Sequence, residues 1–345
     1  MSHPVRVAVI GAGSFACRYH IPNLLSRRDA TIVAIVKRTE AHRRLIQDRF
    51  NIPAGYADVE TMLAEAQPEA VIVCSPHHLH GVHCRACLER GLPVLVEKPL
   101  TVDPAEAREL VEMAKCRNIP FLVAYNRRVD PAYRWAARWI QEERIGEIRF
   151  LEGRRFADLS WMLRGETAPS EEEREKWWPE GDRPNFRAEQ EAMGEGFLDD
   201  GGTHILDALL WLACARPTAF NALQTAYASG LEVRSAINVK FENGVLASIS
   251  SSGDTAPIFP YELLIHGSRG ALALSKESFI AMQDGKKETI TPSYPPCTTT
   301  GHFIDCLQNP ELEVLCPAES AIAPVVLARI AFASARTGQT LPWKE

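Results

Sequence analysis

Short, mostly apolar runs mark the first part of the chain. Val5–Ile10 and Ala70–Cys74 are the clearest, and amphipathic stretches such as 40–50 separate such runs. This alternation is typical of strands buried on both faces of a parallel sheet and covered by helices. It predicts a doubly wound α/β domain over residues 1–125. The predicted strands are 5–10, 31–36, 55–56, 70–74, 93–97 and 120–124, and the predicted helices include 40–50, 59–66 and 104–116.

The pattern changes after residue 125. A helix is predicted over 131–143, and several strand-like segments follow it. Short turns such as Glu242-Asn243-Gly244 join consecutive segments, which indicates antiparallel pairing. Residues 126–345 are therefore predicted to form an α+β domain with a mostly antiparallel, open sheet. Its predicted strands are 147–157, 218–227, 232–241, 244–252, 259–267, 270–275 and 278–282.

The charged segment 158–195 interrupts these strands. It holds three tryptophans and is long for a plain loop. Long loops in compact domains are commonly lids or binding segments. A lid is therefore one interpretation, and a disordered surface insertion is the other.

Composition narrows the function more than the fold. The 345 residues are 46% hydrophobic and 24% charged, which is ordinary for water-soluble domains, and the net charge of −6 gives no general attraction to nucleic acid or anionic lipid. The N-terminus lacks a signal-like apolar region, and we expect no run near the ~20 apolar residues of a membrane helix. A cytoplasmic protein acting on a small molecule is expected. Its nine scattered cysteines are expected to be reduced and mostly buried.

A glycine-rich loop follows the first predicted strand and opens a predicted helix. The sequence Gly11-Ala12-Gly13-Ser14-Phe15-Ala16 is the G-x-G-x-x-A fingerprint of dinucleotide-binding Rossmann domains, in its required context. The two glycines allow a tight turn and close approach of a pyrophosphate, and the helix start offers free N–H groups. Nucleotide binding is therefore predicted, and an incidental glycine turn is the alternative. The predicted contacts are Gly11, Gly13, Ser14, Phe15 and Ala16.

Lys37, Arg38 and Thr39 end the second predicted strand. An NAD-specific site carries Asp or Glu here for the ribose 2′-hydroxyl. Two cations and a hydroxyl suit the 2′-phosphate of NADP instead, since each charge-assisted hydrogen bond contributes about 1.5–3 kcal/mol. NADP is therefore the favoured cofactor, and NAD is possible. Solvated charges at the head of a helix are the alternative interpretation.

Polar residues also follow the fourth predicted strand, where the carboxyl ends of parallel strands form the ligand crevice. On the next helix His80, His83, Cys84 and Cys87 share a face, a spacing that could ligate zinc. Structural zinc sites usually draw their ligands from separate segments, so we favour packed cysteines and no metal. The predicted crevice residues are Cys74, Ser75, Pro76, His77 and His80.

Two further groups suggest the chemistry. Glu97 and Lys98 end the strand 93–97, and a Lys there faces a bound molecule more often than bulk water. Asp200, His204 and Asp207 would share one face of a helix that begins near residue 200. Carboxylates beside a His can fix its tautomer and tune its pKa near neutrality, as proton transfer to an alcohol or carbonyl requires. A solvated Lys98 and a structural His204 are the alternatives.

In combination these motifs resemble a known family. The loop GAGSFA, the strand end Glu97-Lys98-Pro99-Leu100, the segment Asn126-Arg127-Arg128 and Asp200-x-Gly202-x-His204-x-x-Asp207 are similar, in order and spacing, to the glucose-fructose oxidoreductase, inositol dehydrogenase and rhizopine-catabolism protein (Gfo/Idh/MocA) family. The resemblance implies a Rossmann domain followed by a domain whose open sheet often mediates dimers or tetramers. It also implies hydride exchange between nicotinamide and a secondary alcohol or ketone of a sugar, sugar derivative or cyclitol.

The resemblance implies roles for individual residues as well. Lys98 would hydrogen-bond the reacting oxygen, His204 would pass the proton, and Asp200 would orient the substrate or His204. Arg127 would be a further substrate contact, and the Lys98–Pro99 bond is cis in some relatives. The expected cofactor contacts beyond the glycine loop are Lys37, Arg38, Thr39, Cys74, Ser75, Pro76, His77, His80, Glu97, Lys98 and Asn126.

A dehydrogenase or reductase dependent on NAD(P) is thus the leading expectation. A redox-assisted glycosidase with a tightly bound cofactor and a non-catalytic nucleotide-binding regulator are the alternatives. We expect a homodimer or homotetramer. The particular sugar or cyclitol and the direction of reaction do not follow from the sequence.

Overall fold

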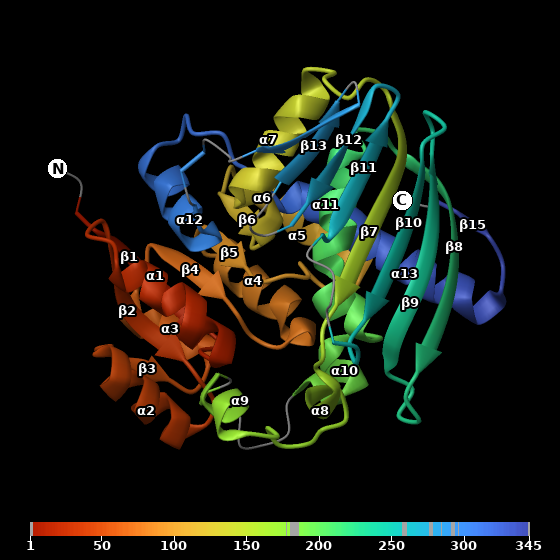
Figure 1. Ribbon diagram of the computed structural model, residues 1–345. Helices are drawn as coiled ribbons and strands as arrows, with labels where there is room; N and C mark the ends of the chain where they lie inside the picture. Colours follow the sequence, from red (N-terminus) through yellow and green to blue (C-terminus); the bar gives the residue numbers. More distant parts are fainter. Residues whose placement is uncertain are drawn as a thin grey trace. The chain divides into compact units, whose positions relative to one another are not determined.

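Two compact units make up the protein. The computed structural model describes residues 3–176, 178–179, 186–256, 261–275, 279–283, 285–290, 294–295 and 297–343 (Figure 1). The first unit comprises Met1–Ala124, Arg164–Gly194 and Thr298–Ile322, and the second comprises Tyr125–Leu163, Glu195–Cys297 and Ala323–Glu345. The chain leaves the first unit next to the expected boundary and later returns to it twice. The expected division into residues 1–125 and 126–345 assigned both of these returning segments to the second domain.

Six parallel strands form the sheet of the first unit, in the order β3-β2-β1-β4-β5-β6. All residues of β4 and β5 are buried, as their uniformly apolar sequences predict. The predicted doubly wound parallel sheet is confirmed, and the strand order reverses between β1 and β4, where such sheets bind ligands. The strands are β1 Val5–Ile10, β2 Ala30–Val36, β3 Gly55–Tyr56, β4 Ala70–Val73, β5 Val94–Val96 and β6 Phe121–Val123.

Aspartate side chains cap the N-termini of the predicted helices 59–66 and 104–116. The Asp103 side chain accepts a hydrogen bond from the Ala105 N–H at 2.8 Å, and Asp58 accepts one from Thr61 at 2.9 Å. Phe303 and Ile304 of α12, from the late return of the chain, pack into the same core as β1 and β4. The helices are η1 Ala16–His20, α1 Ile21–Leu25, α2 Glu40–Phe50, α3 Val59–Ala66, η2 His77–Leu79, α4 His80–Leu88, α5 Pro104–Cys116, α9 Glu171–Lys176, η3 Phe186–Ala188, α10 Gln190–Met193, α12 Thr299–Gln308 and η5 Ala318–Ala321.

The second unit is built on a nine-stranded sheet of order β14-β13-β12-β11-β7-β10-β9-β8-β15. Only β7 and β10 pair in parallel within the described strands, so the predicted mostly antiparallel sheet is confirmed. β14 and β15 were not predicted, and residues 259–260 of the predicted strand 259–267 and residue 278 of the predicted strand 278–282 lie outside the described residues. The strands are β7 Ile148–Phe156, β8 Pro217–Ala226, β9 Glu232–Phe241, β10 Leu246–Ser252, β11 Leu263–Gly267, β12 Gly270–Leu274, β13 Phe279–Gln283, β14 Lys286–Ile290 and β15 Leu341–Pro342.

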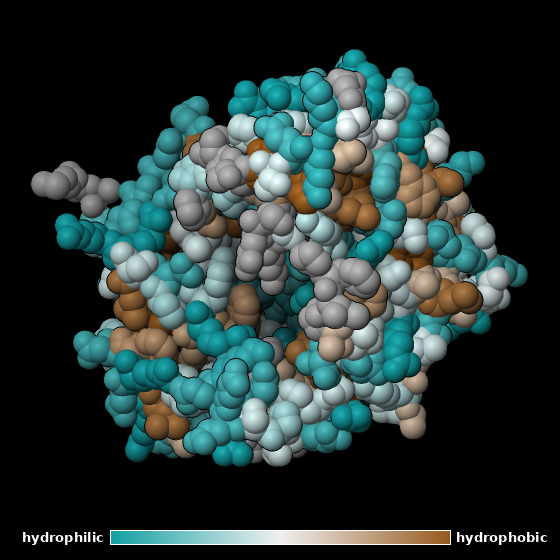
Figure 2. Space-filling model, viewed as in Figure 1, coloured by the Kyte–Doolittle hydropathy of each residue, from teal (hydrophilic) through white to brown (hydrophobic). Residues whose placement is uncertain are grey.

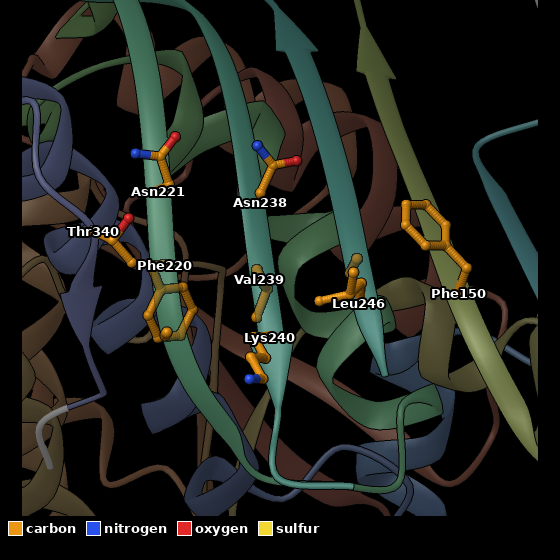
Figure 3. A pocket seen from close by; sticks show the side chains of 10 residues that line it. Phe150, Phe220, Asn221, Asn238, Val239, Lys240, Leu246 and Thr340 are labelled. Carbon is orange, nitrogen blue, oxygen red and sulfur yellow. The ribbon is translucent and has the colours of Figure 1, made fainter. Parts of the chain in front are cut away.

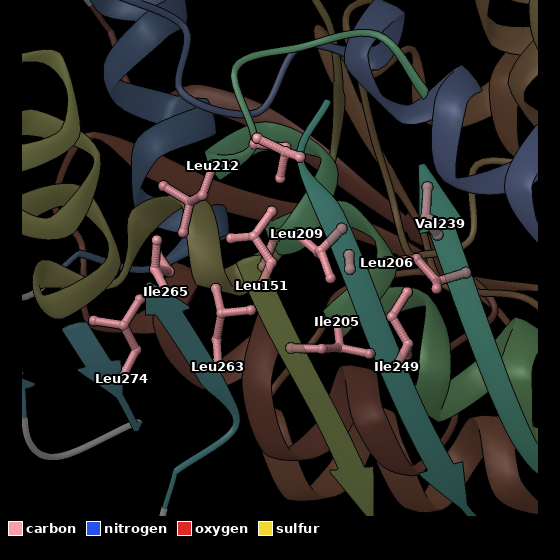
Figure 4. Packing of buried hydrophobic residues seen from close by; sticks show 14 of the residues in the cluster. Leu151, Ile205, Leu206, Leu209, Leu212, Val239, Ile249, Leu263, Ile265 and Leu274 are labelled. Atoms are coloured by element: carbon pink, nitrogen blue, oxygen red, sulfur yellow. The ribbon is translucent and has the colours of Figure 1, made fainter. Parts of the chain in front are cut away.

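Helix α11 covers one face of this sheet. Its residues Ile205, Leu206, Leu209 and Leu212 point at apolar side chains of the strands (Figure 4). The buried positions of β9 alternate along the strand, so the side chains between them lie on the opposite, exposed face of the sheet. The helices of this unit are α6 Asn126–Val129, α7 Pro131–Gln141, α8 Ser160–Leu163, η4 Leu198–Gly202, α11 Thr203–Leu212 and α13 Ile322–Thr337.

A shallow groove crosses the open side of this sheet (Figure 3). Phe150, Asn221, Asn238 and Lys240 are among its lining residues. Two large apolar side chains of these strands are exposed to solvent, Leu223 at 72% and Leu246 at 47%. This sheet face therefore presents apolar surface outside the core.

One helical stretch is long and apolar enough to cross a membrane by length and composition alone, contrary to the expectation that no run comes near that length. It spans Ala318–Thr337, and 56% of its most apolar part is buried inside the protein. Leu327, Ala328, Ala331 and Phe332 belong to the core cluster of the second unit. Core packing therefore accounts for its apolar character.

Hydrophilic side chains cover most of the face shown in Figure 2, with hydrophobic patches among them.

Candidate functional site

The glycine loop after β1 is pressed against the end of β4. Gly11 has a φ of +78°, and its N–H donates to the Val36 carbonyl at 3.0 Å. A Cβ at Gly11 would lie 2.5 Å from backbone atoms of Ser75. Only glycine fits there, as the fingerprint predicts for the tight turn.

A continuous helical segment starts at Ser14, and its first turns are the π-helix η1. The Cys17 N–H donates to the Gly13 carbonyl at 3.0 Å, so the N–H groups before it precede the internal ladder of the helix. Such groups suit the phosphates of a dinucleotide. Ser14 and Ala16 are buried, and Phe15 stacks on Tyr19 with ring centroids 5.2 Å apart. The loop thus fits a dinucleotide, with Gly11–Ala16 as the residues that would hold it.

The end of β2 is cationic, as predicted. The Lys37 N–H donates to the Tyr56 carbonyl at 3.0 Å, and Arg43 donates to the Lys37 carbonyl at 2.8 Å. The Arg38 side chain is exposed and forms no ion pair with the part of the chain that the structure describes. Thr39 occupies the N-cap position of α2. No carboxylate stands among residues 37–39.

Buried histidines tie the end of β4 to its surroundings. The two ring nitrogens of His80 lie 2.7 Å from the Pro99 carbonyl and 2.9 Å from the Ser75 carbonyl. His83 Nδ1 lies 2.9 Å from the Ser75 hydroxyl, and burial lowers the pKa of His83 to about 4. Burial also raises the pKa of the Cys84 and Cys87 thiols. Both ring nitrogens of His80 are thus used by carbonyl groups, which leaves packing as the role of this face. No group of three metal-ligating side chains lies within the described ranges.

Part of the segment 158–195 docks on the same strand end. His77 Nδ1 lies 2.7 Å from the Met193 carbonyl, and His78 Nδ1 lies 3.2 Å from the Ala192 carbonyl. Phe186 contacts the His77 ring edge to face. The described residues of this segment are therefore partly helical and packed, which favours the lid or binding interpretation over a disordered insertion.

Lys98 follows β5, and its neighbour Glu97 is held by a buried chain of hydrogen bonds. Glu97 Oε1 lies 3.0 Å from His20 Nε2, and His20 Nδ1 lies 2.8 Å from the Thr300 hydroxyl of α12. Glu97 Oε2 accepts the Lys98 backbone N–H at 3.2 Å. Since an ionised carboxylate only accepts, His20 donates from Nε2 to Glu97. Lys98 is half-buried, and the Lys98–Pro99 bond is cis.

In the second unit, Asp200 and His204 lie at the start of the α11 helical segment. Asp200 belongs to the π-helix η4 and is buried, whereas His204 is half-buried in the first turn of α11. Tyr125 packs edge-on against the His204 ring, and its hydroxyl lies 2.8 Å from the Thr203 hydroxyl. The structure therefore brings Asp200 and His204 into consecutive helical turns, as predicted.

Asp207 has a different role from the one expected. Its buried carboxylate accepts hydrogen bonds from Arg128 Nε at 3.0 Å and Arg128 Nη2 at 2.8 Å. The ion pair fixes α6 to α11. The carboxylate of Asp207 thus pairs with Arg128 and not with His204. The prediction that Asp207 tunes the pKa of His204 is therefore wrong.

Arg127 likewise forms a buried ion pair, with Glu262. Its Nε and Nη2 donate to both carboxylate oxygens of Glu262 at 2.6–2.9 Å, and its Nη1 donates to Asn126 Oδ1 at 2.7 Å. Only 5% of its side chain is exposed. The structure thus favours a positioning role for Arg127 over direct substrate contact, and it uses Asn126 to orient Arg127.

Arg155 of β7 has much poorer partners. Its Nη1 lies 3.5 Å from the Phe156 carbonyl and 3.9 Å from Glu262. Its Nε is shielded from solvent and has no hydrogen-bond partner among the described residues. A buried donor left without an acceptor costs about 1–3 kcal/mol. Such a group calls for an explanation in the function of the protein.

Charged groups also hold η4 in place. Glu232 of β9 accepts the Leu198 N–H at 2.9 Å and the Ser235 hydroxyl at 2.6 Å. Arg329 of α13 forms ion pairs with Asp199 and Glu195. Burial raises the pKa of Glu232 to about 7. These residues fix the turn that carries Asp200.

Several of these residues carried no sequence signal. His20 and Thr300 are separated by 280 residues, and Arg155 and Glu262 lie in ordinary strand and loop sequence. From the sequence alone, any of these arginines could be matched with any carboxylate. The sequence therefore offers possible ion pairs but does not show which of them form. Lys98 belongs to the first unit, and Asp200 and His204 belong to the second.

Curated oxidoreductases are similar in sequence to this chain. Among curated relatives, the D-glucoside 3-dehydrogenase of Escherichia coli is 29% identical over 61% of this chain and 54% of its own length. The inositol 2-dehydrogenase of Corynebacterium glutamicum is 26% identical over 72% of this chain and 67% of its own length. The chain thus spans about half the length of the first of these relatives.

Solved structures share the fold. An aldose-aldose oxidoreductase from Caulobacter crescentus is 17% identical, with a TM-score of 0.82 over 99% of this chain and 100% of its own. A levoglucosan dehydrogenase in complex with NADH and levoglucosan is 18% identical, with the same TM-score and coverage. Residues 5–125 match the oxidoreductase family with an NAD-binding Rossmann fold, and residues 133–273 match the Gfo/Idh/MocA C-terminal domain. The chain therefore belongs to the Gfo/Idh/MocA family of NAD-binding oxidoreductases.

Proposed function

We propose that this protein is an NADP-dependent dehydrogenase or reductase that exchanges hydride with a secondary alcohol or ketone of a sugar, sugar derivative or cyclitol. One observation carries the proposal: this member of the family combines three features. They are a glycine loop that fits a dinucleotide, Lys98 directly after β5, and His204 one turn after Asp200 at the start of α11. Relatives named for a glucoside and for inositol support the substrate class.

The residues divide the chemistry of alcohol oxidation. A dinucleotide held by Gly11–Ala16 would supply, through its nicotinamide, the hydride acceptor for the carbinol carbon. His204 takes the hydroxyl proton as general base, and Asp200 orients His204 or the substrate. The Lys98 ammonium hydrogen-bonds the reacting oxygen and stabilises the negative charge that develops on it. In the reverse direction His204 returns the proton to the carbonyl oxygen.

The catalytic assignment predicts strong effects from two substitutions. Lys98→Ala and His204→Ala should each lower kcat about 10²- to 10⁴-fold, the usual contribution of general acid–base catalysis, and His204→Ala should do so without loss of cofactor binding. Nicotinamide absorbance over a panel of sugars, inositols and sugar derivatives with both cofactors provides the measurement. Unchanged turnover in both variants would show that the mechanism is wrong. No observation on the described residues favours a glycosidase or a non-catalytic regulator.

The cofactor preference rests on the cationic end of β2. Arg38→Ala should raise the KM for NADP about 10- to 100-fold and leave the KM for NAD nearly unchanged, because only NADP carries the 2′-phosphate. Arg44→Ala is the matched control, since Arg44 lies on the same helix start and pairs with Glu40. Equal losses for both cofactors would remove the NADP assignment.

We further propose a cytoplasmic homodimer or homotetramer assembled through the exposed face of the nine-stranded sheet. The exposed apolar residues Leu223 and Leu246 support this surface. Leu223→Glu should lower the molar mass measured by light scattering after gel filtration. A mass of one chain in the unsubstituted protein would contradict the proposal.

A further inference from the structure

Arg155 lies on the face of β7 that α11 covers. A Cβ at Gly153 would lie 2.8 Å from Ile205 and 3.4 Å from Leu209, so residue 153 faces that helix. Side chains alternate along a strand, so Arg155 projects from the same face as Gly153. Asp200 interacts electrostatically with Arg155. Arg155 therefore lies toward the end of α11 that carries Asp200 and His204.

Three arginines of this unit can be compared by one edge of the guanidinium, formed by Nε and Nη2. This edge presents two parallel N–H groups that match the two oxygens of a carboxylate. In Arg127 the edge is occupied by Glu262, and in Arg128 it is occupied by Asp207. In Arg155 the same edge has no hydrogen-bond partner among the described residues. Arg155 thus has the geometry of its two neighbours without their carboxylate.

The nearest carboxylate that the structure places beside Arg155 is already paired with another arginine. Glu262 already forms the bidentate pair with Arg127 and is 3.9 Å from Arg155 at its nearest. Burial, followed by the positive charge of Arg127, lowers the pKa of Arg155. Asp200 partly offsets this effect. A further negative group at the Nε edge would therefore be stabilised.

We propose that Arg155 binds a carboxylate of the substrate, so that the natural substrates are sugar acids or carboxylated cyclitols rather than neutral sugars. The inference rests on the proposed function for the position of the substrate near Asp200 and His204. A carboxylate accepts both N–H groups of the free edge, whereas a hydroxyl oxygen meets one of them. Arg155 is thus a specificity-determining residue of this enzyme.

Matched ligand pairs test the proposal. D-Glucuronate and D-glucose, D-galacturonate and D-galactose, and D-gluconate and D-glucitol differ in a carboxylate. Binding to the full-length protein with NADP is measured by calorimetry, and turnover is measured by nicotinamide absorbance. We expect at least one acid to bind about 10- to 100-fold more tightly than its neutral counterpart, the range of charge-assisted hydrogen bonds.

Arg155→Gln should abolish this preference by weakening acid binding about 10- to 100-fold, while Arg155→Lys should restore part of it through charge without the planar edge. Arg154→Gln is the matched control, because residue 154 projects from the opposite face and pairs with Glu152. Thermal melting confirms that each variant folds. Equal loss for acids and neutral compounds in Arg155→Gln, or no preference for any acid in the unsubstituted protein, would overturn the proposal.

The two hypotheses fail separately. Acid binding that depends on Arg155 but yields no reduced nicotinamide with any ligand would contradict the proposed dehydrogenase and leave the carboxylate site intact. Turnover of neutral sugars, combined with no preference for any acid or with an acid preference that persists in Arg155→Gln, would support the dehydrogenase and contradict the carboxylate site.

Discussion

At the scale of single residues, Lys98 depends on partners that lie far away in the sequence. Thr300, His20 and Glu97 form a buried chain that ends at the Lys98 backbone N–H. Each hydrogen bond contributes about 0.5–1.5 kcal/mol, but an unsatisfied buried partner costs more. The chain therefore fixes Glu97 strongly, and Glu97 in turn fixes the residue that carries the candidate catalytic ammonium.

Two substitutions of His20 distinguish the roles of its two ring nitrogens. His20→Gln places an amide N–H near the Nε2 position and should keep the bond to Glu97, whereas His20→Asn reaches the Nδ1 position and should lose it. In His20→Asn, hydrogen exchange at the Lys98 amide should rise and kcat should fall about 10-fold with cofactor affinity unchanged. Mass spectrometry of the peptide around Lys98 reads the exchange. Identical behaviour of the two variants would contradict this role.

Gly11 is limited by space as well as by backbone conformation. Gly91 has nearly the same φ, +75° against +78°, but open space where a Cβ would lie. Gly91→Ala should cost only about 1–2 kcal/mol for the left-handed backbone. Gly11→Ala should cost about 1–3 kcal/mol more, because the added methyl overlaps the Ser75 backbone. Chemical unfolding measures both, and equal costs would argue against the close approach.

At the scale of elements, the turn before α11 is held by a buried carboxylate. Glu232 caps η4 through the Leu198 N–H, and a Cβ at Gly196 would lie 2.4 Å from Glu232. The helix start that carries Asp200 and His204 is thus positioned by strand β9 and by Arg329 of α13. Neither element could be assigned to this turn from periodicity, since periodicity reports which face is buried but not what it is buried against.

Glu232 predicts a pH dependence of stability. Burial raises its pKa in the folded state to about 7 from an ordinary 4.5. Between these values the folded state binds more protons than the unfolded state, so stability falls as pH rises from about 4.5 to 7 and is constant above. The pKa difference corresponds to at most about 3 kcal/mol.

Glu232→Gln should remove this dependence, so its stability relative to the unsubstituted protein should increase between pH 5 and pH 7. Calorimetric unfolding at several pH values provides the measurement. The exposed Glu242, changed to Gln, is the control and should leave the dependence in place. A parallel pH dependence in Glu232→Gln and the unsubstituted protein would contradict the assignment.

At the scale of the whole molecule, local signals predicted most elements and few of their partners. The strands of the first sheet and the glycine loop follow from short-range patterns and were found where expected. The roles of Asp207 and Arg127 were predicted less well, because an ion pair between distant residues leaves no trace in either local sequence. The edge strands β14 and β15 were missed since they are short and mostly exposed.

The late return of the chain to the first unit has a consequence for synthesis. Thr300, Phe303 and Ile304 complete the environment of His20 and the core beneath β1, yet they are added after nearly nine-tenths of the 345 residues. When the glycine loop and all six strands of the Rossmann sheet have left the ribosome, this unit still lacks α12. The nucleotide-binding unit therefore reaches its final form only after most of the second unit has been translated, so the two units must mature together rather than in the order of the sequence.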